Sequence, residues 1–359
     1  MLFEPFSLST TTLNNRIVMA PLTRSRAVDN NTPNSLMAEY YAQRATAGLI
    51  ITEGTSPSPN GLGYARIPGL FNDAQVQGWK LVTDSVHAKG GKIVVQLMHT
   101  GRVSHAANLP TGAEVLGPSA EACPGEMWTD VQGSQPHTAP RAMTEADIKA
   151  TIREYATAAR LAIETGFDGI ELHAANGYLL EQFLNGNVNH RTDAYGGSGE
   201  GRNRLILEVA RAAVQEIGAE RVGIRLSPYG VFNSTGAFSG VDKQYVALVK
   251  ELSTLGLMYL HVLDHSAMGA PLVPAQLKAD LRAAFSGPFI LAGGLDSTSA
   301  VQALTEGHAD LIAMGRAFIA NPDLVERMRQ NAPTNVPDAN TFYTPDAAGY
   351  TDYPTLAAG

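Results

Sequence analysis

The stretch that decides the fold is Gly169-Ile170-Glu171-Leu172-His173-Ala174-Ala175-Asn176-Gly177-Tyr178, a short β-rich run that ends in a polar turn. Ile170 and Leu172 share one parity along the run, so Glu171 and His173 share the other. Side chains alternate across a strand, and a strand covered by protein on both faces would bury these two polar groups. Because buried polar groups are costly without partners, the run predicts a strand that offers polar side chains to a ligand or to one another.

Similar apolar runs recur on both sides of this stretch, each followed by a loop and a helical pattern. The runs predict strands at residues 16–19, 49–52, 92–97, 169–173, 222–226, 259–262, 289–292 and 311–314. Eight strand–helix alternations without a linker indicate the α/β class and one (β/α)8 TIM barrel, so residues 1–359 are expected to form a single domain. Residues 100–143 are too long for a simple crossover, and we expect an excursion over the catalytic face with a small hairpin.

Composition limits the classes of function. The chain has 359 residues, of which 44% are hydrophobic and 17% charged, and this excludes wholesale disorder. Lys and Arg number 26 against 34 Asp and Glu, so a net charge of −8 without a basic block makes nucleic acid and membrane surfaces poor partners. Cys123 is the single cysteine, which excludes an internal disulfide and a thiolate metal cluster, and no metal site is expected. The absence of a long apolar run and of a signal-like start leads us to expect a cytoplasmic enzyme.

The same alternation places further polar residues inside the barrel. It turns Gln96 and Arg225 inward near the ends of their strands, where barrel enzymes build their active sites. One alternative is a self-satisfied ionic core in which Glu171 pairs with Arg225. The last two strands end in Gly293-Gly294 and Gly315-Arg316, and loops at these two places in a barrel commonly bind phosphate. The sequence therefore predicts a phosphorylated ligand.

Three polar groups follow one another where the central strand ends. His173 and Asn176 can both donate hydrogen bonds to one oxygen, and the phenol of Tyr178 is a competent proton donor near neutral pH. A lone histidine would more often be a satisfied core residue. Because three such groups fall within six residues at a barrel mouth, we favour a catalytic role.

Motifs along nearly the whole chain resemble the old yellow enzyme family of flavin-dependent ene-reductases, in particular bacterial alkene reductases and N-ethylmaleimide reductases. The motifs are HAANGY at 173–178, NHRTDAYGGS at 189–198, NRIVMAPLTRSRA at 15–27, LMAEYYAQRATAGLIITEGT at 36–55, HTGR at 99–102, GRAFIANPDLV at 315–325 and GYTDYPTL at 349–356.

The resemblance implies a tightly but non-covalently bound FMN. Its expected contacts are Pro21, Thr23, Gly54, Gln96, Arg225, Gly293, Gly294, Gly315 and Arg316. His173 and Asn176 match the pair that holds the substrate's carbonyl or nitro oxygen, and Tyr178 matches the proton donor. The substrate pocket would also be lined by Tyr64, Tyr343 and Met98.

The reaction implied by the resemblance is ping-pong ene-reduction. Hydride would come from NAD(P)H, with NADPH favoured, and would reduce the activated C=C bond of enals, enones, maleimides or nitroalkenes. Nitro groups and nitrate esters are further candidate substrates, and the expected assembly is a monomer or a homodimer. Two alternatives stay open: a cofactor-free barrel lyase or isomerase of a phosphorylated substrate, and a non-catalytic flavin-binding protein.

The sequence departs from the family's usual pattern in three places. Met98 stands where tryptophan is frequent, which should change the shape of the pocket rather than the reaction type. Gly199 and Gly201 replace residues with side chains at a helix start and should loosen it. Asn176 is the variant found in many members, in place of a second histidine.

Overall fold

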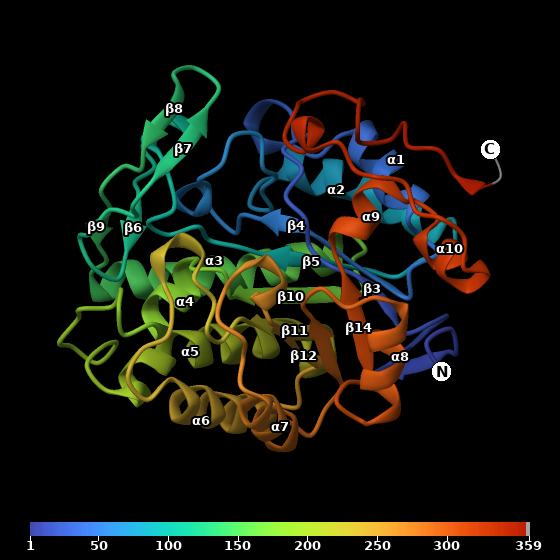
Figure 1. Ribbon diagram of the computed structural model, residues 1–359. Coiled ribbons are helices and arrows are strands. Elements are labelled where there is room, and N and C mark those ends of the chain that lie inside the picture. The colour runs from blue at the N-terminus through green and yellow to red at the C-terminus, as the bar shows by residue number, and fades with distance from the viewer. Residues whose placement is uncertain (357–359) are drawn as a thin grey trace.

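The computed structural model describes residues 1–356 and contains one closed barrel of parallel strands wrapped by helices (Figure 1). The order around the barrel is β10-β11-β12-β13-β14-β3-β4-β5, and β5 pairs with β10 to close it. The barrel strands are β3 (Ile17–Met19), β4 (Leu49–Thr55), β5 (Ile93–Leu97), β10 (Gly169–Ala174), β11 (Val222–Leu226), β12 (Tyr259–Leu263), β13 (Phe289–Ala292) and β14 (Leu311–Met314). The predicted (β/α)8 barrel and its strands are therefore confirmed.

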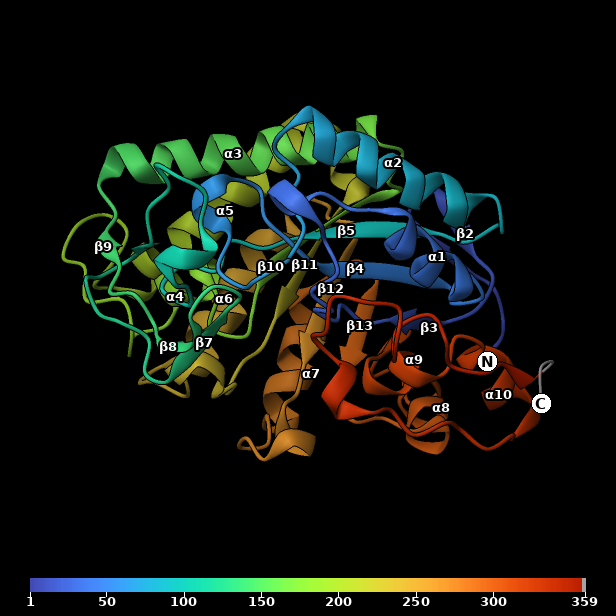
Figure 2. The same cartoon turned by 90° about the horizontal axis from the view of Figure 1, so that it is seen from above.

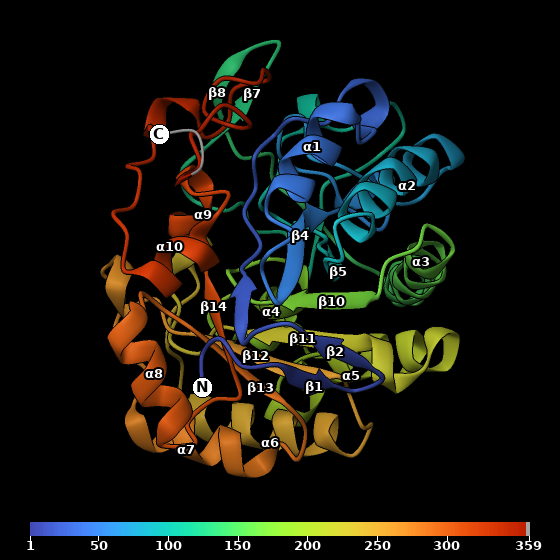
Figure 3. The ribbon, with the colours of Figure 1, turned by 90° about the vertical axis from the view of Figure 1, so that its right-hand side faces the viewer.

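Helices cover the outer face of the barrel, as the views from two further directions show (Figures 2 and 3). They are α1 (Ser35–Gln43), α2 (Asp73–His87), α3 (Glu145–Glu164), α4 (Leu179–Leu184), α5 (Gly199–Ile217), α6 (Val241–Ser253), α7 (Ala275–Ala284), α8 (Ser297–Thr305), α9 (Arg316–Ala320) and α10 (Leu324–Gln330). Side chains of one strand parity, such as Ile170 and Leu172, pack with apolar helix residues into the main core. Within residues 1–356, no helix combines the length and the apolar character needed to cross a membrane.

The excursion after β5 contains the expected hairpin. Its antiparallel strands are β7 (Glu126–Thr129) and β8 (Gly133–Pro136), and two short strands, β6 (Leu116–Gly117) and β9 (Arg141–Ala142), pair beside it. The hairpin stands out from the body of the molecule in Figure 1. At its base, Val103, Cys123 and Met127 pack against Tyr64 and Tyr178, so the excursion does reach the catalytic face.

The barrel interior has an apolar lower layer and a polar upper layer. The lower layer is closed by an N-terminal hairpin that the sequence did not predict, β1 (Phe6–Leu8) with β2 (Thr11–Leu13), whose two leucines join the interior cluster. Tyr259 fills the space beside Gly223, where an added Cβ would lie 2.3 Å from the ring. The upper layer carries the polar side chains that strand alternation predicted.

Glu171 has partners inside the barrel other than the arginine that the ionic-core alternative named. Its carboxylate accepts a hydrogen bond from Gln96 Nε2 at 2.7 Å and pairs with His261 Nδ1 at 2.8 Å, whereas Arg225 acts on it only through its charge. Because a carboxylate only accepts, the shared proton lies on His261 Nδ1. Burial alone would raise the pKa of Glu171, but His261, Arg225 and Gln96 outweigh it and hold the pKa below its usual value. Glu171 is therefore satisfied within the barrel, as the ionic-core alternative held, but by Gln96 and His261 and not by a direct pair with Arg225.

Helix α5 starts with two glycines, and the packing of the backbone requires one of them. Helix α5 begins at Gly199, and the Ser198 hydroxyl caps it by accepting the Gly201 N–H at 3.0 Å. A Cβ on Gly201 would lie 2.3 Å from the carbonyl oxygen of Gly196, whereas one on Gly199 would meet only ordinary contacts. Gly201 thus permits a close approach of backbone, and Gly199 does not have this role.

Candidate active site

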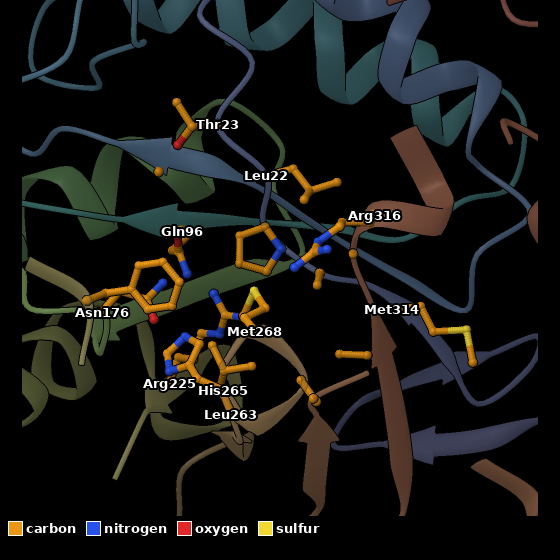
Figure 4. Close-up of a pocket in the computed structure, with 18 of the residues that line it drawn as sticks. Leu22, Thr23, Gln96, Asn176, Arg225, Leu263, His265, Met268, Met314 and Arg316 are labelled. Carbon is orange, nitrogen blue, oxygen red and sulfur yellow. The ribbon is translucent and has the colours of Figure 1, made fainter. Parts of the chain in front are cut away.

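A cavity of about 570 Å³ opens at the carboxyl ends of the barrel strands, within the size range of small-molecule and cofactor sites (Figure 4). Its lining comes from both halves of the barrel. In the close-up, Asn176 and Gln96 lie toward one end and Arg316 lies toward the other, with Arg225 and His265 between and below them. The cavity is therefore long enough to bring the turns after β13 and β14 and the polar turn after β10 to one ligand.

Glycine backbone forms the end of the cavity beyond β13 and β14. Gly293 and Gly294 have φ angles of +139° and +74°, in the region that favours glycine. An added Cβ would lie 2.5 Å from the Asp264 carbonyl oxygen at Gly293 and 2.4 Å from the Ala267 side chain at Gly294. Arg316 is exposed next to Gly315 and lines the same end of the cavity. A phosphate could be held here by backbone N–H groups and by the guanidinium.

Polar side chains from inside the barrel form the floor of the cavity. Gln96 is fixed by Glu171, and Arg225 is 6% exposed with no hydrogen-bond partner for its Nε within the described residues. His265, at the end of β12, also lacks a partner for its buried Nδ1 in this part of the chain. Burial and the nearby Arg225 lower the pKa of His265 to about 4, so this imidazole is neutral at physiological pH.

The polar turn after β10 brings its three predicted side chains to the opposite end of the cavity. His173, Asn176 and Tyr178 all line it, and the rings of His173 and Tyr178 meet edge to face with centroids 4.9 Å apart. Burial, followed by Arg225, places the pKa of His173 well below its usual value, so the imidazole is neutral. Burial raises the pKa of Tyr178, which therefore keeps its proton.

Nearly all of the predicted contact residues share this one cavity. Its lining includes Pro21, Thr23, Gly54, Gln96, Met98, His173, Asn176, Tyr178, Arg225, Gly293, Gly294, Gly315, Arg316 and Tyr343. Tyr64 is the exception: it lies behind Tyr178, with the two hydroxyls 3.0 Å apart, and does not line the cavity. Gly54 leaves space for Met98, since a Cβ there would lie 2.5 Å from the Met98 sulfur.

Sequence reasoning missed several residues of the site. His261 could have been found, because it has the inward parity of β12 between Tyr259 and Leu263. The loop residues Phe232, His265, Met268 and Leu295 carry no periodic signal and enter the cavity only through the fold. Their loops are placed by contacts with distant segments, such as the hydrogen bonds from Arg102 to the carbonyls of Asn233 and Ser234.

The cavity fits FMN in shape and in chemistry. Gly293 and Gly294 expose backbone in a turn that has no space for a Cβ, and buried polar atoms of His173, Asn176, Arg225 and His265 have no protein partner among the described residues. Buried polar atoms without partners are rare, so a polar ligand is expected between them. Gln96 and Arg225 could hold the polar edge of the flavin ring, with its phosphate at the glycine turns.

The barrel and this cavity are those of an FMN-dependent oxidoreductase that uses a nicotinamide as reductant. The chain belongs to the NADH:flavin oxidoreductase / NADH oxidase family, whose sequence model matches residues 1–335. Within it, the chain is an old yellow enzyme homologue, and the resemblance found in the motifs is confirmed.

Individual relatives agree over their full lengths. A probable flavin mononucleotide-dependent alkene reductase of Leishmania infantum is 40% identical, with 99% of this chain and 98% of the relative covered. The old yellow enzyme homologue of Zymomonas mobilis superposes with a TM-score of 0.95 at 40% identity and covers 99% of both chains. Morphinone reductase in complex with tetrahydroNAD superposes with a TM-score of 0.93 at 43% identity, covering 99% and 97%. The alternative of a cofactor-free lyase or isomerase is therefore wrong.

Proposed function

We propose that this FMN-dependent oxidoreductase reduces the activated C=C bond of small electron-poor alkenes, namely enals, enones, maleimides or nitroalkenes, and that it does so as one FMN-binding domain. The observation that carries the proposal is the segment 173–178, which brings a neutral imidazole, a carboxamide and a protonated phenol to one wall of the cavity, across from the glycine turns. The Leishmania relative, described as an alkene reductase, supports the same reaction class.

His173 and Asn176 would bind the activating oxygen of the substrate. A neutral histidine has one N–H, and the carboxamide of asparagine has two, so both side chains can donate to a single oxygen. Negative charge grows on this oxygen when hydride reaches the β-carbon. Donors that are already in place stabilise that charge in a buried site without reorganisation.

Tyr178 would supply the proton. Its hydroxyl contacts the Tyr64 hydroxyl at 3.0 Å, and burial keeps it protonated at neutral pH. A positioned general acid of this kind typically accelerates a proton transfer by about 10²–10⁴-fold. Strongly electron-poor nitroalkenes depend less on this proton, because the charge left by hydride addition is already well stabilised.

The remaining residues position the cofactor. When bound, FMN supplies the hydride chemistry, and the protein supplies orientation and electrostatics. Arg225 would place a buried positive charge beside the flavin, and Gln96, fixed by Glu171, would meet its polar edge. Met98 and Tyr343 would shape the substrate's side of the cavity.

Two half-reactions test the proposal. The purified protein should show a yellow flavin spectrum, release FMN on denaturation and lose its visible absorbance when mixed with NADPH or NADH. Mixing the reduced protein with cyclohexenone or a nitroalkene in a stopped-flow instrument should restore that absorbance. If nicotinamide reduced the protein but no enone, maleimide or nitroalkene reoxidised it, the proposed substrate class would be wrong, and the protein would be an oxidoreductase that acts on other substrates.

A further inference from the structure

The loop that carries Asn176 has a strained backbone conformation, and contacts with the rest of the protein must maintain it. Asn176 has a φ of +58° and Gly177 a φ of +73°, so two successive residues adopt the left-handed conformation. Glycine does this freely, but asparagine has to be held there by the surrounding structure. We call residues 174–178 the anchoring loop, because they place the Asn176 carboxamide and the Tyr178 phenol in the cavity.

A buried carboxyl below the loop collects its backbone hydrogen bonds. The Gly177 N–H donates to Glu181 Oε2 at 2.7 Å. The Asn176 N–H donates to Ser227 Oγ at 2.9 Å, and the Ser227 hydroxyl in turn donates to the same Glu181 oxygen at 3.1 Å. Tyr245 donates its hydroxyl to Glu181 Oε1 at 3.2 Å. Both strained residues are therefore connected to one side chain.

Glu181 makes these contacts away from the cavity and without a counter-charge. Its side chain is 1% exposed, Ser227 is fully buried, and neither lines the cavity. Among the described residues no ion pair includes Glu181, so hydrogen bonds from Gly177, Ser227 and Tyr245 compensate for its burial. Burial raises the pKa of Glu181 to about 7, because these three donors only partly offset the loss of water. Burying a carboxyl costs free energy, so its presence below the loop indicates a role beyond filling space.

We propose that Glu181 is a positioning residue for substrate binding: by accepting the Gly177 N–H and the Ser227 hydroxyl, it holds Asn176 in the conformation that presents its carboxamide to the substrate oxygen. The inference rests on the proposed function and deepens it. Glu181 acts through the loop and does not touch the reacting atoms, so the alternative is a structural role in packing α4 against the barrel.

Two substitutions of similar size separate these roles. In Glu181→Met the acceptors are lost while the volume is kept. In Glu181→Gln the amide oxygen can still accept from Gly177 and Ser227, and the amide N–H can donate to the Tyr245 hydroxyl. Ser227→Ala keeps the Glu181 carboxyl and its bond to Gly177, but it removes the hydroxyl that links the Asn176 N–H to Glu181, and it serves as a second test should Glu181→Met fail to fold. Tyr245→Phe is the matched control, because it removes a contact of Glu181 that does not lead to the loop.

The measurements are the affinity of the FMN-loaded protein for 4-nitrophenol, which mimics the enolate, the affinity for FMN, and amide hydrogen exchange of residues 174–179 with and without FMN. We expect Glu181→Met and Ser227→Ala to weaken 4-nitrophenol binding by at least about 10-fold, since a buried hydrogen-bonded group is left unpaired. The amides of Asn176 and Gly177 should exchange faster, while FMN affinity stays within about two-fold of the unmodified protein. Glu181→Gln and Tyr245→Phe should stay within about three-fold for 4-nitrophenol.

Two results would overturn the inference. One is unchanged 4-nitrophenol affinity and loop exchange in Glu181→Met and Ser227→Ala. The other is an equal loss of affinity for FMN and for 4-nitrophenol in both variants, which would show that Glu181 and Ser227 have a general structural role. If the unmodified protein did not bind 4-nitrophenol at all, the proposed function would be in error, and loop exchange alone would still decide whether Glu181 holds Asn176.

Discussion

At the end of the cavity beyond β13 and β14, the wall is glycine backbone with one exposed arginine, whereas beyond β10 it consists of buried side chains fastened by a chain of hydrogen bonds. At this glycine end of the cavity, Gly293 and Gly294 have left-handed φ angles and no space for a Cβ, whereas a Cβ on Gly315 would meet only ordinary contacts. The end beyond β10, which we call the anchoring end, is formed by the side chains of His173, Asn176 and Tyr178, with the Glu181 carboxyl beneath their loop.

The contrast matches two different tasks. A phosphate is recognised well by backbone N–H groups at fixed positions, and such a site selects by shape. A substrate oxygen that gains charge during the reaction needs donors of set protonation state, which only side chains in a tuned environment provide. Substitutions at the glycine end should therefore act on cofactor binding, and those at the anchoring end on substrate chemistry.

The largest effect is expected from Gly293→Ala. The new Cβ would lie 2.5 Å from the Asp264 carbonyl oxygen at a φ of +139°, so the turn must move and the phosphate site with it. We expect FMN affinity to fall by at least about 100-fold in a fluorescence titration of the apoprotein. Gly307→Ala is the control, since its φ is +72° but its Cβ would meet open space. Equal FMN affinities for the two variants would contradict the proposed phosphate site.

We expect Tyr178→Phe to affect only the reaction at the end of the cavity beyond β10, and not the cofactor site at the glycine end. Reoxidation of the reduced protein by a weakly activated enone should slow by about 100-fold, while reduction by nicotinamide is unchanged, because only the first of these steps needs the proton donor. Stopped-flow absorbance measures both rates. Tyr64→Phe is the control: it removes the hydrogen-bond partner of Tyr178 and should cost less than about 10-fold. Equal slowing of the two half-reactions in Tyr178→Phe would argue against its role as proton donor.

Glu181, beneath the anchoring loop, should also make the stability of the protein depend on pH. The pKa of Glu181 is about 7 in the folded protein, above the value of about 4.3 for an unfolded chain. The folded state therefore holds this proton more tightly. The resulting stabilisation is complete below about pH 4.3 and is lost as the pH rises through 7.

Glu181→Gln removes this titration and isolates its effect. From pH 5 to pH 8, the free energy of unfolding of the unmodified protein should fall relative to that of the variant by about 2.5 kcal/mol. Urea unfolding at a series of pH values measures the difference, and contributions from other titrating groups cancel. A difference that is constant with pH would mean that the Glu181 carboxyl is not protonated on folding.

Arg316→Ala should give the smallest effect, because this guanidinium is exposed and would share the proposed phosphate with backbone donors. We expect FMN affinity to fall by about 10-fold and riboflavin affinity to stay unchanged, since riboflavin lacks the phosphate. Arg329→Ala, an exposed arginine of α10 paired with Glu326, is the control. A parallel loss of riboflavin binding would show that Arg316 acts on the turn rather than on the phosphate.

Much of the fold could be predicted because the barrel strands are continuous apolar runs. The apolar pattern does not set the strand ends: it predicts that β4 ends at residue 52, whereas the strand reaches Thr55, because a bulge between Ile51 and Gly54 shifts its pairing with β5. The hairpin β1–β2 was missed because each of its strands has three residues, too few to show alternation. Its burial depends on the barrel that it closes.

The site was predictable where strand geometry sets a side chain's direction and not where loops do. Gln96, His173 and Arg225 follow from parity alone, and His261 would have followed in the same way. Tyr64 was assigned to the pocket by resemblance, yet it lies one layer behind Tyr178. Phe232 and Met268 lie on loops, and Glu181 belongs to a short helix below the site, where only the hydrogen bonds of the folded chain reveal a connection to Asn176.

The most direct test of this account is a crystal structure of the protein with FMN and 4-nitrophenol bound. The account predicts that the phosphate contacts the turns at Gly293–Gly294 and Gly315–Arg316, and that the phenolate oxygen lies within hydrogen-bond distance of both His173 and Asn176. A phosphate bound elsewhere, or a phenolate oxygen that contacts neither side chain, would contradict the assignment of the two ends of the cavity.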